Sequence, residues 1–594
     1  MPPTHCCKAA GLMFWLLLSL TLAGQETDWR TDYEKSGYLD TPRYPETVAY
    51  CQRLAEASPW IEYRSFGTSP QGRELPLVIL DRNGNFTPES VRASGNAVML
   101  VLNCIHAGEC DGKDASLILL REIAISKTLA ALADNVTLLV IPIFNVDGHE
   151  RFGPYNRLNQ NGPREMGFRV TAQRYNLNRD FLKAQTPEMQ AWLKLYRQWE
   201  PDFMVDNHVT DGADHQYVLT YGIETEANVA PPLRRWTLET LEPYLAEKMK
   251  EDNFLIARYF FLRNRPQVSN GLSFLPYSPR FSTGYGAAQN RIFYLVEMHA
   301  LKDYQTRVNG NFHLMKHMLT LLNREKDRLL EANRQSDAYS AKELPGRYLP
   351  LDFQADPQDS TLRDFAGIEY QVEQSEISGG PRVIYGSKPQ TMQVPYFDHI
   401  VATDSARIPY AYLIPPQWQF QIGKLIAHGV RVDYLSEALT LEVESYRFRN
   451  ISWARQPFEG QFMPTYESES LREERHYPAG SAVVIMNQHS NRLIAHLLEP
   501  DGPDSFVKWG FWNNIFERKE YGEDYMLETI ARQMLRDDPA LEAEFRQYLA
   551  DNPSLAENRW ARLYFFYART PYWEDDVNLY PVGKLAEKTA LPLR

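Results

Sequence analysis

Residues 101–120 read VLNCIHAGECDGKDASLILL and join three kinds of sequence in one short stretch. An apolar run ends at His106, a turn of small residues carries Glu109, and a segment with apolar residues at helical spacing follows. The first run is typical of a buried strand and the last of a helix. A strand that leads directly into a helix predicts an α/β unit. The polar pair between them either caps a turn or binds a metal.

The same alternation of strand-like and helix-like runs continues from about residue 28 to residue 333. Four further apolar runs predict buried strands, at residues 72–80, 137–148, 201–208 and 291–300. Helical patterns occupy residues 111–132, 186–200, 231–251 and 303–335. The alternation predicts an α/β fold with a mixed, largely parallel sheet and helices on both faces. Ligands of such sheets bind at the carboxyl ends of the strands.

Three segments of different texture divide the chain. Residues 1–24 contain Lys8, a short apolar run and small residues, which predicts a secretory signal peptide and a secreted or periplasmic protein. The α/β pattern predicts a first domain at residues 28–335. Residues 347–594 predict an accessory region, first mixed β and then α. No segment after the signal peptide has the length and apolarity of a membrane span.

Charge and cysteine content narrow the class further. The formal net charge of −13 argues against a nucleic-acid partner, because phosphate contacts require basic surfaces. Cys51, Cys104 and Cys110 lie after the signal peptide, and three thiols do not make a disulfide-dense scaffold. A Cys104–Cys110 bridge and unpaired buried thiols are both compatible with the sequence. Oligomeric state is not indicated.

Polar side chains end several of the predicted strands. His106 and Glu109 follow the second strand, His208 ends the fourth, and Glu297 lies within the last. Two histidines and a glutamate form a common open zinc shell, so His106, Glu109 and His208 are candidate ligands. Glu297 is a candidate general base. Each residue alone is compatible with an ordinary core or ion-pair role, and the ordered set is more specific than any member.

This ordered set resembles the zinc carboxypeptidase family typified by carboxypeptidases A and B, over roughly residues 44–322. HAGE resembles the family's first ligand pair, DNHVTDG carries its third ligand, and FYLVEMH carries its general base. The resemblance implies one Zn²⁺ per chain. In NLNRD it places the family's Asn-Arg pair at Asn178 and Arg179, which would bind the substrate's terminal carboxylate.

Two further roles are implied by the resemblance with alternatives. The arginine that stabilises the oxyanion is best matched by Arg157, with Arg164 and Arg169 nearby. The tyrosine that contacts the substrate is matched by Tyr285, with Tyr277 as the alternative.

One position departs from the family pattern. Asn176 stands where family members often carry an aspartate that orients the first zinc histidine. The Asn176 amide oxygen can still accept from the imidazole, but without a full charge, which implies a somewhat altered site.

The implied activity is that of a zinc metallocarboxypeptidase acting on a peptide or protein with a free C-terminus. Two alternatives stay open. One is a metallopeptidase of murein stem peptides. The other is a non-catalytic envelope binding protein of the same fold.

Overall fold

The computed structural model describes residues 27–210 and 212–594 of the chain. The predicted signal peptide lies outside the described residues. Among the helices of the described part, none is both long and apolar enough to cross a membrane.

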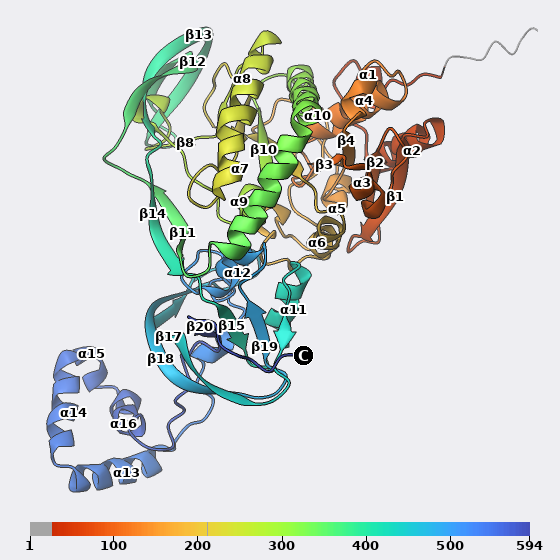
Figure 1. Ribbon diagram of the computed structural model, residues 1–594. Coiled ribbons are helices and arrows are strands. Elements are labelled where there is room, and N and C mark those ends of the chain that lie inside the picture. The colour runs from red at the N-terminus through yellow and green to blue at the C-terminus, as the bar shows by residue number, and fades with distance from the viewer. Residues whose placement is uncertain (1–26, 211) are drawn as a thin grey trace, which may run out of the picture.

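An eight-stranded sheet forms the centre of the first region, in the order β1-β2-β4-β3-β5-β10-β6-β7 (Figure 1). The strands are β1 (Ile61–Thr68), β2 (Glu74–Leu80), β3 (Ala97–Leu102), β4 (Val136–Ile141), β5 (Phe203–Thr210), β6 (Leu219–Gly222), β7 (Ile256–Arg258) and β10 (Ile292–His299). The central strands β4, β3, β5 and β10 run parallel, while β2 and β6 flank them antiparallel. The predicted mixed, largely parallel sheet is therefore confirmed. All five predicted strands exist, and β1, β6 and β7 are additional.

Helices cover both faces of this sheet. The helices of the first region are α1 (Asp32–Lys35), α2 (Tyr44–Ala57), α3 (Pro88–Ser94), α4 (Asp111–Ala124), α5 (Val146–Glu150), α6 (Pro187–Trp199), α7 (Pro231–Trp236), α8 (Glu242–Glu251), α9 (Ser282–Ala288) and α10 (Tyr304–Lys342). Helices α2, α4, α8 and α10 share one core with the sheet, and α6 and α9 share the other.

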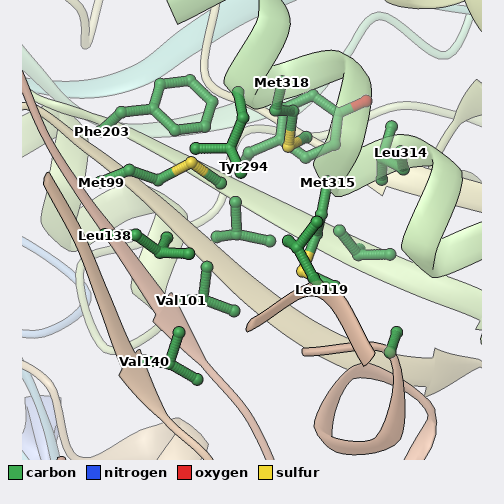
Figure 2. Packing of buried hydrophobic residues seen from close by; sticks show 14 of the residues in the cluster. Met99, Val101, Leu119, Leu138, Val140, Phe203, Tyr294, Leu314, Met315 and Met318 are labelled. Atoms are coloured by element: carbon green, nitrogen blue, oxygen red, sulfur yellow. The ribbon is translucent and has the colours of Figure 1, made fainter. Parts of the chain in front are cut away.

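Successive side chains of the buried strand β3 point alternately into the two hydrophobic cores on either side of the sheet. Met99 and Val101 point to the core beneath α4 and α10, whereas Leu100 and Leu102 point to the opposite core. Figure 2 shows Met99 and Val101 near Met315 and Leu119 of the covering helices. A strand buried on both faces requires the continuous apolar run that residues 97–102 contain.

The C-terminal region packs against helices α6 and α9, which cover one face of the central sheet. Its strands are β11 (Tyr348–Ala355), β12 (Thr361–Gln374), β13 (Pro381–Phe397), β14 (Ile400–Arg407), β15 (Ala411–Ile414), β16 (Asp433–Tyr434), β17 (Leu439–Trp453), β18 (Pro464–Tyr477), β19 (Ala482–Ile485) and β20 (Gly583–Leu585). Its helices are α11 (Gln419–Ala427), α12 (Asn491–Leu498), α13 (Asp524–Asp537), α14 (Ala540–Asp551), α15 (Pro553–Ala556) and α16 (Arg559–Tyr567). Tyr412, Leu425 and Leu498 belong to the same core as α6 and α9.

The two regions interleave. The short strands β8 (Phe261–Leu262) and β9 (Leu272–Ser273) of the first region extend the β12–β13 hairpin, with Leu272 opposite Tyr396. Residue 335, the predicted end of the first domain, lies inside α10, because no glycine or proline occurs between it and Pro345. The division into residues 28–335 and 347–594 stays a prediction. Cys51, Cys104 and Cys110 are buried, unbridged thiols.

Candidate metal centre and active site

Strand register brings the distant candidate residues together. His106 follows β3, and the turn after it closes when the Glu109 amide donates to the His106 carbonyl at 2.9 Å. His208 lies in β5 and Glu297 in β10, and these two residues stand opposite each other in the parallel pairing. Since β5 lies between β3 and β10, both histidines and both glutamates meet at one edge of the sheet.

Three donor atoms of these residues converge on one point. His106 Nδ1 lies 3.1 Å from Glu109 Oε1, and His208 Nδ1 lies 3.0 Å from Glu109 Oε2. The two Nδ1 atoms are 3.1 Å apart. Ligands at about 2.0–2.1 Å from a tetrahedral zinc are separated by about 3.3 Å, so the spacing fits one zinc ion.

The outer partners of the imidazoles orient their lone pairs inward. His106 Nε2 lies 3.0 Å from Asn176 Oδ1, an oxygen that also accepts from the Asn178 amide at 3.0 Å. His208 Nε2 lies 3.0 Å from an Asp206 carboxylate oxygen. With a proton on each Nε2, both Nδ1 atoms would present a lone pair toward the Glu109 carboxylate, which is the tautomer that a metal requires. Three facing acceptors require a cation, which is the fit expected of zinc ligands.

Electrostatics agree with this requirement for positive charge. Burial lowers the pKa of His106 to about 4, so this ring is neutral near pH 7. Although burial opposes ionisation, Arg157 and the facing imidazoles hold the pKa of Glu109 well below its usual range. The carboxylates of Asp206 and Glu109 hold the pKa of His208 well above its usual range against the effect of burial. Without a metal, a proton on His208 supplies the missing charge.

Glu297 lies beside the ligands and is largely buried. Burial raises the pKa of its carboxyl group to about 8, an effect that the neighbouring His208 opposes. A cation held by the ligand set also opposes it and favours the carboxylate form.

The three candidate oxyanion arginines occupy different places. Arg157 Nη1 pairs with Glu109 at 2.8 Å and its Nη2 donates to the Val209 carbonyl at 3.2 Å, so its guanidinium is occupied behind the ligand. Arg164 pairs with Asp40 at the surface. Arg169 is 41% exposed, lies 3.6 Å from Glu109, and acts electrostatically on Glu297. The geometry therefore favours Arg169 over the expected Arg157.

Asn178 and Arg179 lie in a short helical turn next to Asn176. Arg179 donates to the Asn178 carbonyl at 2.7 Å, and its guanidinium lies 4.3 Å from the Phe281 ring centre. Among the ion pairs of the described residues, none involves Arg179. Burial and the nearby Arg169 lower the pKa of Arg179 to about 10, so it remains charged at pH 7.

The expected tyrosine does not reach the site. Tyr285 is fully buried, and its hydroxyl contacts His428 Nδ1 at 3.1 Å, because α9 directs it into the second core. Tyr277 instead packs edge-on against Phe281, which lies beneath Arg179. It also lines a cavity of about 400 Å³ together with Gly222 and Glu224. Of the two tyrosines, Tyr277 packs near Arg179, and the substrate-contacting role stays a prediction.

Sequence reasoning missed Asp206, the partner of His208. The sequence does indicate this partner. In VDNH an aspartate lies two residues before the histidine, and residues two apart on a strand share one face. The Ser282 hydroxyl donates to the same carboxylate at 2.6 Å.

The fold and the His₂Glu cluster define an α/β protein with a candidate metal site. Residues 47–214 match the family model described as zinc carboxypeptidase. Over residues 47–214 the chain is similar to zinc carboxypeptidases, which supports a peptide hydrolase with zinc as its metal. The matched segment contains His106, Glu109 and His208, and ends before Glu297.

Curated relatives include carboxypeptidase 2 of Trichophyton rubrum, 24% identical over 493 residues, covering 79% of this chain and 84% of that protein. Carboxypeptidase 2 of Trichophyton equinum is 22% identical over 502 residues, with the same coverage of 79% and 84%. Solved structures include a metallo-carboxypeptidase from Pseudomonas aeruginosa, 19% identical with a TM-score of 0.34, covering 47% of this chain and 69% of that one. Another is carboxypeptidase A from Helicoverpa armigera, 14% identical with a TM-score of 0.36, covering 50% and 74%.

Proposed function

We propose that the protein removes the C-terminal residue from peptides outside the cytoplasm, with His106, Glu109 and His208 as zinc ligands. The observation that carries the proposal is the convergence of three ligand atoms within 3.0–3.1 Å, with Glu297 in register beside His208. A zinc ion bound there would supply a Lewis acid that lowers the pKa of water near it to about 7.

The residues around the ligands divide the remaining work. Glu297 accepts a proton from the attacking water and donates it to the departing amine. Arg169, partly exposed and next to Glu109, stabilises the negative charge that develops on the carbonyl oxygen.

Arg179 selects the end of the chain. Its guanidinium has no ion-pair partner among the described residues and can bind a terminal carboxylate by two parallel hydrogen bonds, with Asn178 beside it. An internal peptide bond offers no such carboxylate, so the arrangement favours exopeptidase cleavage. The cavity beside Tyr277 is the place for the terminal side chain.

Purified protein is expected to contain about one zinc and to shorten a peptide from its C-terminus, as followed by mass spectrometry. The same peptide with an amidated C-terminus should be cleaved far more slowly, because Arg179 then loses its anionic partner. Glu297→Gln should retain zinc and lose about 10²–10⁴-fold in kcat, the usual contribution of a general base. Glu247→Gln, at an exposed position of α8, serves as the matched control.

Full activity without zinc, or equal rates on the free and amidated peptides, would overturn the proposal. The proposed export rests on the N-terminal pattern, and the mass of the exported chain should show removal of residues 1–24.

A further inference from the structure

A turn of the C-terminal region, residues 458–461, lies against the segment that carries Asn176. The turn closes through Phe458 N to Gln461 O at 2.9 Å and Gln461 N to Phe458 O at 3.0 Å. The Asn176 amide donates to Glu459 Oε2 at 2.9 Å, across 283 residues of sequence. Gln461 donates to Gln185 Oε1 at 3.1 Å, which gives the turn a second contact with the first region.

Close approach at this turn depends on Gly460. Its φ of +77° lies in the left-handed region, and a Cβ there would stand 3.0 Å from the Tyr175 hydroxyl and ring. A side chain would therefore displace the turn from the segment that begins at Tyr175. Glycine at position 460 therefore permits the close contact between the turn and Tyr175, the residue before Asn176.

The contact continues from Asn176 to the metal ligands. The Glu459 carboxylate accepts a charge-assisted hydrogen bond from the Asn176 main chain, while the Asn176 side chain holds His106 Nε2 at 3.0 Å. The main-chain bond limits movement of Asn176, and Asn176 in turn sets the angle of the imidazole. Outer partners of this kind typically change metal affinity or activity by about 10–100-fold when they are removed.

The C-terminal region also contacts the segment that carries Tyr277 and Arg280. Arg280 pairs with the fully buried Asp504 at 2.5 Å, and its amide donates to the other oxygen of that carboxylate at 2.8 Å. The Arg280 guanidinium lies 5.0 Å from the ring centre of Trp509, and Phe458 stacks on Trp509. Arg280 is three residues from Tyr277 and adjacent to Phe281, so this anchor fixes the segment beneath Arg179.

We propose that the C-terminal region completes the active site, and that Glu459 is a positioning residue that orients His106 through Asn176. The expected effect on turnover rests on the proposed peptidase activity, whereas the expected effect on zinc retention rests only on its assignment of the zinc ligands. The region is thus part of the catalytic unit, because it holds both the segment with Asn176 and the segment with Tyr277.

The test compares Glu459→Ala and Glu459→Gln with the control Glu469→Ala in the full chain. Glu469 lies in β18, is 57% exposed, and pairs with Arg449. Zinc retention is measured by competition with a coloured chelator. Glu459→Ala should retain zinc about tenfold less tightly and lose about tenfold in kcat, because His106 is then less well oriented. Glu459→Gln keeps an acceptor oxygen and should fall between Ala and the wild type.

Zinc retention in Glu459→Ala equal to that in Glu469→Ala would overturn the proposal. A thermal melt identifies a variant that fails to fold, and in that event the Gln variant decides the matter through its zinc retention. A wild-type protein that binds zinc but does not shorten peptides would contradict the proposed function alone, because the chelator competition would still report on His106.

Discussion

Tyr277 and Tyr285 lie eight residues apart and have opposite surroundings. Tyr285 donates to His428 Nδ1 at 3.1 Å and accepts from Gln289 at 3.0 Å within a closed core. Tyr277 stands at a cavity wall next to Phe281. We therefore expect the Tyr285 hydroxyl to contribute to stability and the Tyr277 hydroxyl to substrate contact.

Removal of each hydroxyl should separate these purposes. Tyr285→Phe leaves two buried partners unsatisfied and should cost about 1–2 kcal/mol in unfolding free energy with kcat/KM unchanged. Tyr277→Phe should keep stability within about 0.5 kcal/mol and lower kcat/KM about three- to tenfold, as expected for one lost hydrogen bond. Thermal melts and peptide kinetics on both variants provide the measurement. A kinetic defect in Tyr285→Phe with normal Tyr277→Phe would restore the sequence-based expectation.

The site residues that lie in regular strands are predictable from the sequence, and those on irregular segments are not. His208 and Glu297 lie in apolar runs whose strand character is readable locally, and parallel pairing then places their side chains at one edge. Arg169 and Tyr277 lie on irregular segments, where periodicity gives no direction. The segment of Tyr277 is fixed by Arg280 and Asp504, which are 224 residues apart in sequence. A contact of that range has no local signature, so the choices of Arg157 and Tyr285 could not be tested from the sequence.

Helix α6 begins with a carboxyl group that has no partner. Glu188 is 1% exposed, and its two carboxyl oxygens accept no hydrogen bond from the other described residues. Burial raises the pKa of Glu188 from 4.5 to about 7, and the nearby Asp147 and Asp180 act in the same direction. A raised pKa means that the folded state holds its proton longer than the unfolded state does. Stability from this group is thus complete below about pH 4.5 and is lost as the pH rises to about 7.

Glu188→Gln should remove that dependence. At pH 8 the variant is expected to gain about 3 kcal/mol in unfolding free energy over the wild type, and at pH 5 less than about 1 kcal/mol, because one pKa unit corresponds to about 1.4 kcal/mol. Urea unfolding at both values measures the difference, with Glu200→Gln at the exposed end of α6 as the control. A gain of equal size at both pH values would indicate packing instead of charge.

The whole molecule joins two regions that follow each other in sequence and interleave in space. β9 of the first region pairs with β13 of the second, and one core contains residues of α6, α9, α11 and α12. The sequence predicts a separate accessory region because composition changes near residue 336. It does not predict the shared core, because the apolar faces that meet there are far apart along the chain.

Helices α13 to α16 differ from the rest of the C-terminal region. They have their own small cores, formed around Phe566 and Leu563, and stand apart from the sheets in Figure 1. The chain leaves and returns at one place, since the Asn578 amide donates to the Ile515 carbonyl at 2.9 Å. Such an excursion can be shortened at small entropic cost, because the ends to be joined already lie close together.

Replacement of residues 519–573 by a Gly-Ser linker of about four residues should therefore leave the main body intact. We expect kcat/KM within about twofold of the wild type and an unchanged main melting transition, because the contacts that hold Asn176 and Arg280 lie outside the excursion. Glu459→Ala, a single change in the same region, should lose more activity than this deletion. If the shortened chain loses more than about fivefold in kcat/KM at normal zinc content, the four helices must contact the peptide substrate, and the catalytic unit would then extend to them.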